Sequence, residues 1–132
     1  MKIICIGRNY AQHAAELNNP IPKEPVVFIK PDSAVLVGSS PFFIPDFSSN
    51  VQYELELTVK INRLGKHIEE RFAHKYYDQI GLGLDFTARD VQEELKSKGL
   101  PWEKAKAFDG SAVIGDFIPK AELVNNADWD FY

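Results

Sequence analysis

The chain has one cysteine and three histidines among its 132 residues, and these shortages exclude several classes of protein. A single thiol, Cys5, excludes a disulfide within the chain, and there is no Asn-x-Ser/Thr glycosylation signal. His13, His67 and His74 have no spacing typical of zinc ligands. A disulfide-stabilised extracellular scaffold and a histidine-based zinc site are therefore disfavoured, and a reducing interior is expected.

Long apolar runs and excess positive charge are also missing. No stretch is long enough to cross a bilayer, and the apolar run that opens the chain is too short for a signal peptide. A formal net charge of −4 at pH 7, without a basic stripe, argues against a nucleic-acid surface. There is no phosphate loop, Gly-x-Ser-x-Gly elbow or dinucleotide fingerprint. We therefore expect a cytoplasmic protein that binds neither nucleic acid nor membrane.

The length and composition of the chain predict one domain over residues 1–132. The sequence is 45% hydrophobic, which is enough to build a single core. Many short strands, few helices and no regular strand–helix–strand repeat favour an α+β, mainly β fold. Apolar and alternating patterns predict strands at 2–7, 26–30, 34–37, 42–44, 53–61 and 80–84, and helices at 9–17, 69–77 and 87–98.

The clearest strand, residues 53–61, carries two glutamates on one face. Glu54 and Glu56 point the same way because side chains two residues apart share a face of a strand. Neighbouring carboxylates repel unless water or a cation separates them. Alternation alone favours a solvated polar face, whereas a hard divalent cation needs a third carboxylate nearby. Asp85, after the apolar run 80–84, could be that third ligand or an ordinary turn aspartate.

Two other groups carry both a functional and an ordinary interpretation. Thr87-Ala-Arg-Asp90 has the spacing of a capping box, which puts Arg89 in the first helical turn, where the dipole disfavours a cation. An anion shared with Gln92 would explain this placement, and so would a surface ion pair. His13 and Glu16, three apart on the helix predicted at 9–17, form either a general-base pair or an exposed polar face.

Five motifs in order resemble the fumarylacetoacetate hydrolase family. The resemblance is closest to its small branch of acylpyruvate hydrolases and oxaloacetate decarboxylases. It implies a roll of mixed β-sheets with a few short helices, usually in a homodimer. It also implies that the C-terminal third of the family domain is missing from this chain. The motifs are Gly7-Arg-Asn-Tyr10 with His13 and Glu16, Pro25 with Phe28, Lys30 and Pro31, then 53–57, 83–92 and 99–109.

The same resemblance implies a reaction and a role for each candidate residue. The implied reaction is Mg²⁺- or Mn²⁺-dependent cleavage of a C–C bond in a 2,4-dioxo acid such as fumarylpyruvate, with oxaloacetate decarboxylation as a second activity. A 2-hydroxyhepta-2,4-diene-1,7-dioate isomerase or related decarboxylase, and an inactive fragment, are the alternatives. The implied residues are Glu54, Glu56 and Asp85 for the metal, Arg8, Lys30, Arg89 and Gln92 for a small 2-oxo acid substrate, and His13, Glu16 and Lys106 for catalysis.

Overall fold

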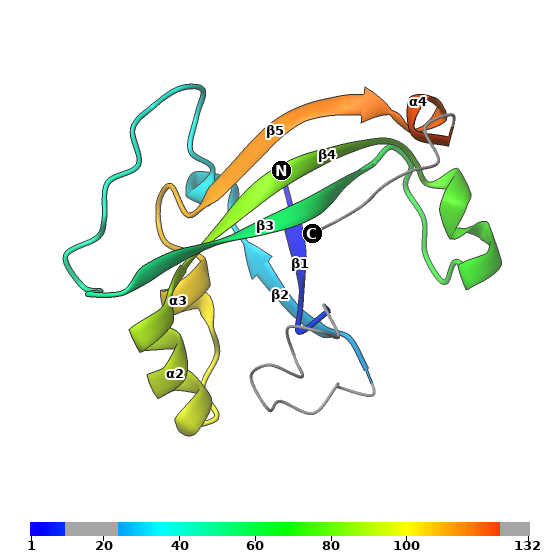
Figure 1. The fold of residues 1–132 in the computed structure, drawn as a ribbon. Coiled ribbons are helices and arrows are strands. Elements are labelled where there is room, and N and C mark those ends of the chain that lie inside the picture. The colour runs from blue at the N-terminus through cyan, green and yellow to red at the C-terminus, as the bar shows by residue number, and fades with distance from the viewer. Residues whose placement is uncertain (10–23, 125–132) are drawn as a thin grey trace.

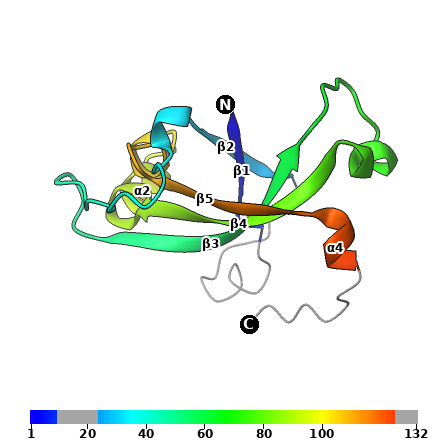
Figure 2. The same cartoon turned by 90° about the horizontal axis from the view of Figure 1, so that it is seen from above.

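Two antiparallel sheets form the framework of the computed structural model, which describes residues 1–9 and 24–124. In the small sheet β1 (Ile3–Gly7) pairs with β2 (Val26–Lys30). The large sheet has the order β3 (Val51–Ile61), β4 (Tyr77–Ala88) and β5 (Ala112–Pro119). The small sheet crosses the large one in both views of the ribbon (Figures 1 and 2). The predicted mainly β fold with short helices is confirmed.

Short helices lie at both ends of the large sheet (Figure 1). At one end α2 (Arg89–Ser97) continues directly from β4 and is followed by α3 (Glu103–Lys106). At the other end lie the 3₁₀ helix η2 (Glu70–Lys75) and α4 (Lys120–Val124). No helix among residues 1–9 and 24–124 is long and apolar enough to cross a membrane.

Several predicted elements are confirmed, and others are corrected. The strand predicted at 26–30 is β2, and those predicted at 53–61 and 80–84 are the central parts of the longer β3 and β4. The segment predicted as a helix at 69–77 is a six-residue 3₁₀ helix. The helix predicted at 9–17 lies outside the described residues except for its first position. β5, α3 and α4 were not anticipated.

The strands predicted at 34–37 and 42–44 do not form. A 3₁₀ turn, η1 (Asp32–Ala34), follows β2, and Val35 then makes a single isolated bridge to Ala112. Further along, the ring of Phe42 stacks on Phe86 with centroids 3.9 Å apart. This loop is therefore attached by side-chain stacking rather than by a hydrogen-bonded ladder.

The predicted capping box at the start of α2 is also wrong. Ala88 occupies the N-cap position, because β4 extends through Thr87 and directs its side chain elsewhere. Asp90 accepts from the hydroxyl of Ser48 and the amide of Ser49, which fastens the preceding loop to the helix. At the other end Gly99 has φ +64°, the left-handed conformation predicted for it.

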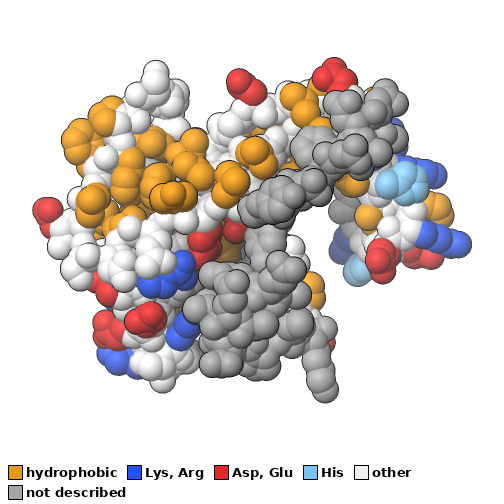
Figure 3. Space-filling model, viewed as in Figure 1, with side chains coloured by type: hydrophobic (Ala, Val, Ile, Leu, Met, Phe, Trp, Pro, Cys, Tyr) orange, Lys and Arg blue, Asp and Glu red, His pale blue; other side chains and the backbone are white. Residues whose placement is uncertain are grey.

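The interior of the described chain is polar and its apolar strand face is open. The largest fully buried side chains are Lys30, Thr87 and Ser111. Alternate residues of β3 point outward, from Tyr53 at 70% exposed to Leu57 at 49% exposed. The space-filling view shows hydrophobic side chains gathered over the sheet and the loop before it, and charged ones over α2 and α3 (Figure 3). The less exposed face of β3 is therefore the one that carries Glu54 and Glu56.

Candidate functional site

Lys106 holds together the two strands that carry the predicted metal ligands. Glu54 of β3 and Asp85 of β4 are direct partners in the antiparallel register. The Nζ of Lys106 lies 2.8 Å from Glu54 Oε2, 2.8 Å from Asp85 Oδ2 and 2.6 Å from the Thr87 hydroxyl. Because α3 ends at Lys106 beside β4, its side chain reaches the cluster from the end of that helix. The ammonium is thus a bridge between two carboxylates.

Lys30 is the second buried ammonium of the cluster, and its surroundings differ. Its Nζ lies 2.8 Å from Asp85 Oδ1 as an ion pair. It also donates to the carbonyl of Ser111 at 3.0 Å, to the hydroxyl of Ser111 at 3.1 Å and to the carbonyl of Lys106. Lys30 therefore ties β2 to β4 and to the loop between α3 and β5. Its side chain is 1% exposed, so most of its contacts are within the protein framework.

Arg89 extends the cluster toward solvent. Its Nη2 lies 2.5 Å from Glu54 Oε1, and its other nitrogens donate to Gln92 Oε1 at 2.6 Å and to Gln52 Oε1 at 3.0 Å. The predicted proximity of Arg89 and Gln92 on one helix face is confirmed. Two amide oxygens and one carboxylate hold the guanidinium in a fixed orientation, with 17% of its side chain exposed.

The charges determine the protonation of the cluster. Burial alone raises the pKa of Glu54, but the charge of Lys106 and hydrogen bonds from Lys106 and Arg89 outweigh it, so the pKa lies below its usual value. Burial lowers the pKa of Lys30, and Asp85 opposes this shift. Burial, followed by the charge of Asp85, raises the pKa of the Cys5 thiol to about 11. Cys5 is therefore a protonated, weakly reactive thiol.

The donor chemistry of the cluster suits a hard divalent cation. Carboxylate oxygens are the ligands that Mg²⁺ prefers, and Glu56 lies two residues beyond Glu54 on the same face of β3. Asp85 Oδ1 is buried 2.8 Å from the Lys30 ammonium, and a carboxylate oxygen has a second lone pair with which to accept. In the part of the chain that the structure describes, no group of three or more His, Cys, Asp or Glu side chains converges to hold a metal. Lys106 lies between the carboxylates instead.

The remaining predicted site residues fall outside this cluster or outside the described residues. Arg8 directly follows β1, is exposed and has φ +57°. His13 and Glu16 lie outside the described residues, so their catalytic role stays a prediction. The roles of Lys30, Arg89 and Gln92 in substrate binding also stay predictions.

Sequence reasoning missed two hydroxyls that complete the cluster. Thr87 was interpreted as a helix cap, yet it shares a face of β4 with Asp85 and contacts Lys106. This period-two spacing was the signal that could have identified it. Ser111 accepts from Lys30 and donates to the carbonyl of Lys106 at 2.9 Å. Its position depends on the turn after α3, and no sequence pattern points to it.

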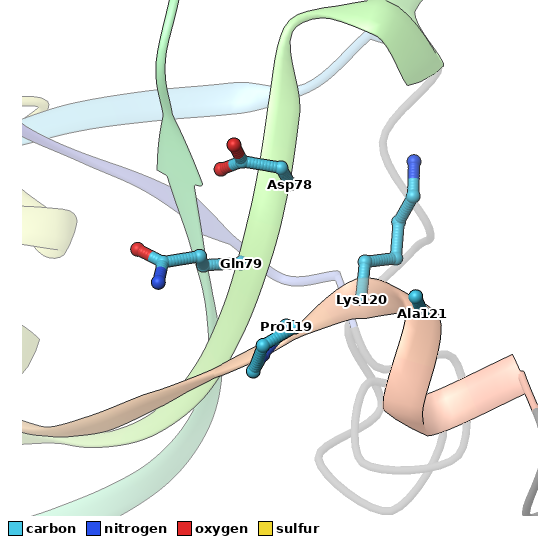
Figure 4. Close-up of a pocket in the computed structure, with 5 residues that line it drawn as sticks. All are labelled: Asp78, Gln79, Pro119, Lys120 and Ala121. Atoms are coloured by element: carbon cyan, nitrogen blue, oxygen red, sulfur yellow. The ribbon is translucent and has the colours of Figure 1, made fainter.

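Two hollows of the surface lie apart from the charged cluster. One, of about 380 Å³, lies at the opposite end of β4 and β5 from Asp85, between Asp78, Gln79, Pro119, Lys120 and Ala121 (Figure 4). Lys120 donates to the carbonyl of His74 at 2.9 Å, which fixes its charge within the framework. The other, of about 840 Å³, is mainly apolar and includes Ile29, Phe47 and Val91. Neither is lined by Glu54, Asp85 or Lys106, so the candidate site is defined by its charged side chains.

Comparison with known proteins places this arrangement in a family. Residues 2–131 match the model of the fumarylacetoacetate (FAA) hydrolase C-terminal domain. The chain belongs to this family, as the resemblance of the sequence motifs predicted.

Two relatives of this chain are named for reactions of oxaloacetate. Over 121 residues, 92% of this chain, it is 43% identical to the mitochondrial oxaloacetate tautomerase FAHD1 of Bos taurus, covering 55% of that protein. It is 44% identical to the mitochondrial oxaloacetate decarboxylase of Dictyostelium discoideum, with 96% of this chain and 60% of that protein covered.

One solved structure among the relatives contains a metal and a small ligand. The fumarylpyruvate hydrolase of Pseudomonas aeruginosa in complex with Mn²⁺ and pyruvate is 36% identical, with a TM-score of 0.84. That match covers 93% of this chain and 55% of the other. The chain therefore spans little more than half the length of the relatives it matches.

Proposed function

We propose that this chain carries the metal-binding half of an enzyme that cleaves a C–C bond in acylpyruvate-type 2,4-dioxo acids with Mg²⁺ or Mn²⁺. The observation that carries the proposal is the Lys106 bridge, in which one ammonium lies 2.8 Å from both Glu54 and Asp85. Paired carboxylates on adjacent strands, surrounded by buried cations, are suited to bind a divalent ion and a small anion together. The Mn²⁺ and pyruvate of the Pseudomonas relative support the same assignment.

The chemistry of a 2-oxo acid explains why this set of charges would be useful. Cleavage, decarboxylation and keto–enol exchange of such an acid all place negative charge on the 2-oxo oxygen, as an enolate. When bound, a divalent ion acts as a Lewis acid that polarises that oxygen and orients the acid. Glu54, Glu56 and Asp85 would hold the ion.

The cations of the chain have distinct parts in this proposal. Arg89, oriented by Gln52 and Gln92, presents a fixed positive charge to the carboxylate of the substrate. Lys106 supplies a second positive charge to the developing enolate, in a site that excludes most water. Water activation in the hydrolytic reaction is assigned to His13 with Glu16, as the sequence predicted.

A second candidate function is oxaloacetate tautomerase or decarboxylase activity. The names of the bovine and Dictyostelium relatives favour it, and both reactions need the enolate but no attacking water. The two candidates differ in their dependence on His13, because only hydrolysis requires a base that activates water.

An assay of this chain with acetylpyruvate, fumarylpyruvate and oxaloacetate, each with Mg²⁺, Mn²⁺ or a chelator, tests the proposal. We expect metal-dependent turnover, lowered by about 100-fold or more in Glu54→Gln and Asp85→Asn because oxyanion and metal stabilisation are lost. Glu69→Gln, at an exposed pair with Arg71, is the matched control and should retain activity.

The outcomes separate the candidates. If His13→Ala loses hydrolysis but retains oxaloacetate turnover, His13 acts only in the reaction that uses water, as the first candidate requires. Turnover of oxaloacetate alone supports the second candidate. Turnover that persists in chelator contradicts the metal, and no turnover of any substrate supports the inactive fragment. The predicted homodimer is tested on the same sample by sedimentation equilibrium.

A further inference from the structure

Two buried lysines share the oxygens of Asp85, yet their other contacts differ in kind. Lys30 also donates to backbone carbonyls and to the Ser111 hydroxyl, none of which is a predicted metal ligand. Lys106 contacts Glu54, Asp85 and the Thr87 hydroxyl, so two of its three oxygen partners belong to predicted metal ligands. A divalent ion would compete with Lys106 and leave most contacts of Lys30 unchanged.

We propose that Lys106 is an exchangeable internal cation, which occupies the divalent-ion position between Glu54 and Asp85 in the metal-free protein and releases both carboxylates when the ion binds. This inference rests on the proposed function, because it assumes that these carboxylates bind the metal.

Electrostatics favours the Lys106 ammonium between the carboxylates when no metal is bound, and disfavours it there once the ion binds. Two carboxylates on directly opposed residues of adjacent strands repel each other, and a buried carboxylate without a cation is costly. An ammonium between them preserves the arrangement of the strands while no metal is bound. Once a divalent ion reaches the same oxygens, an ammonium in contact with them is repelled by the ion. The two cations therefore exclude each other from the bridging position.

The surroundings of Lys106 offer it another partner. The ring of Phe28 lies 5.3 Å from Nζ, and the face of an aromatic ring attracts a cation. Four rotatable side-chain bonds let the ammonium turn toward this ring or toward a bound anion without movement of α3. Lys30 has no equivalent freedom, because its donors reach β4 and the loop before β5 together.

The first test measures Mn²⁺ affinity by calorimetry for the wild-type chain, Lys106→Met and Lys98→Met. We expect Lys106→Met to bind Mn²⁺ about tenfold more tightly, because both the competitor and its repulsion are removed. Its metal-free melting temperature should fall, and Mn²⁺ should raise that temperature by more than in the wild type. Lys98→Met, at an exposed pair with Glu94, should match the wild type in both measurements.

The second test measures the wild-type chain, so its readout is free of any effect of a substitution on the site. The Cε and Nζ signals of labelled lysines are followed by NMR as Mg²⁺ is added to the wild-type chain. Signals of Lys106 and Lys30 are assigned from spectra of Lys106→Arg and Lys30→Arg. We expect the Lys106 signal to move with Mg²⁺ and the Lys30 signal to remain nearly unchanged.

Three results overturn the proposal in different ways. Weaker or equal Mn²⁺ binding by Lys106→Met shows that Lys106 assists the ion or is indifferent to it. A Lys106 signal that does not move at saturating Mg²⁺ shows that the bridge persists in the metal-bound state. If wild type and variants all fail to bind Mn²⁺, the proposed metal-dependent function fails and the exchange fails with it, whereas wild-type binding with equal affinities refutes only the exchange.

Discussion

The two faces of β3 are reversed relative to an ordinary half-buried strand. Glu54, Glu56 and Thr58 face inward, toward the lysines and β4, while Tyr53 and Leu57 of the other face are largely open. In most antiparallel sheets the apolar face packs on the core. Here the inner face holds the site, so the strand places its charged side chains where their interactions are strongest.

The two faces contribute differently to the described chain. Its buried apolar residues are few and mostly small, namely Ala34, Ala88, Leu95, Ala105 and Ala112. The charged cluster therefore fills much of the interior that larger apolar side chains occupy in other domains. Contiguous open apolar surface of this kind is typical of a face that packs against further protein.

The largest predicted effect concerns Asp85, the partner on β4 of the charged residue Glu54. Asp85→Ala should lower the free energy of unfolding by about 3 to 5 kcal/mol, or abolish the cooperative transition, because Lys30 and Lys106 lose their shared buried partner. Chemical denaturation measures the loss. Asp109→Ala, an exposed aspartate, is the control and should change stability little. A loss below about 1 kcal/mol for Asp85→Ala would show that the cluster is solvated.

A smaller effect of opposite sign is expected further along β3, where Thr58 pairs with Gly81. Thr58 points inward, and its hydroxyl is buried with no hydrogen-bond partner among the described residues. Thr58→Val keeps the shape and removes the unsatisfied group, so it should raise the free energy of unfolding by about 1 kcal/mol. Thermal and chemical denaturation of the variant measure the change.

The neighbouring residue on the open face supplies the matched control. Leu57→Thr, at a side chain about half exposed, should cost less than about 1 kcal/mol. A cost above about 2 kcal/mol would show that this face is covered in solution. A destabilising Thr58→Val would instead mean that a water or another group satisfies the hydroxyl.

The smallest effect tests the link between the loop before β3 and α2. Hydrogen bonds from Ser48 and Ser49 lower the pKa of Asp90 from 3.8 to about 2. A carboxyl with a depressed folded-state pKa contributes stability that is present above its unfolded pKa and lost as pH falls. Stability should therefore decline between about pH 4 and pH 2.

Asp90→Asn should flatten this acid limb, as measured by melting temperature across that range. Asp109→Asn, at an exposed position, should leave the slope unchanged. An identical decline in the wild type and Asp90→Asn would assign the acid sensitivity to other carboxyls, of which Glu54 is the first candidate because its pKa is also depressed.

Local patterns accounted for the elements that carry the site. Alternation over 53–61 identified β3 and put Glu54 and Glu56 on one face, and helical spacing brought Arg89 to Gln92. Gly99 ended α2 in the conformation that only glycine adopts easily. These features depend on backbone geometry over a few residues, which a short stretch of sequence specifies.

Features that depend on distant contacts were not predictable. The loop at 34–44 contains strand-like residues, but stacking of Phe42 on Phe86 and the bridge from Val35 to Ala112 decide its path. Thr87 looked like a helix cap until β4 proved to extend through it. The partners of Lys30 and Lys106 are separated from them by up to 81 residues, and no local pattern records them.

By itself the sequence determined that β3 has a charged face and an apolar face, and that five ordered motifs belong to one family. Period-two geometry and side-chain chemistry are sufficient for those conclusions. The expectation that Asp85 follows a strand was wrong, because β4 continues through it to Ala88. Only the tertiary structure decided which face of β3 is inside and which cations share its carboxylates. Burial and ion pairing depend on how β2, β4 and α3 pack together. This packing brings Lys30, Asp85 and Lys106 to the charged face of β3 and so creates the candidate metal site.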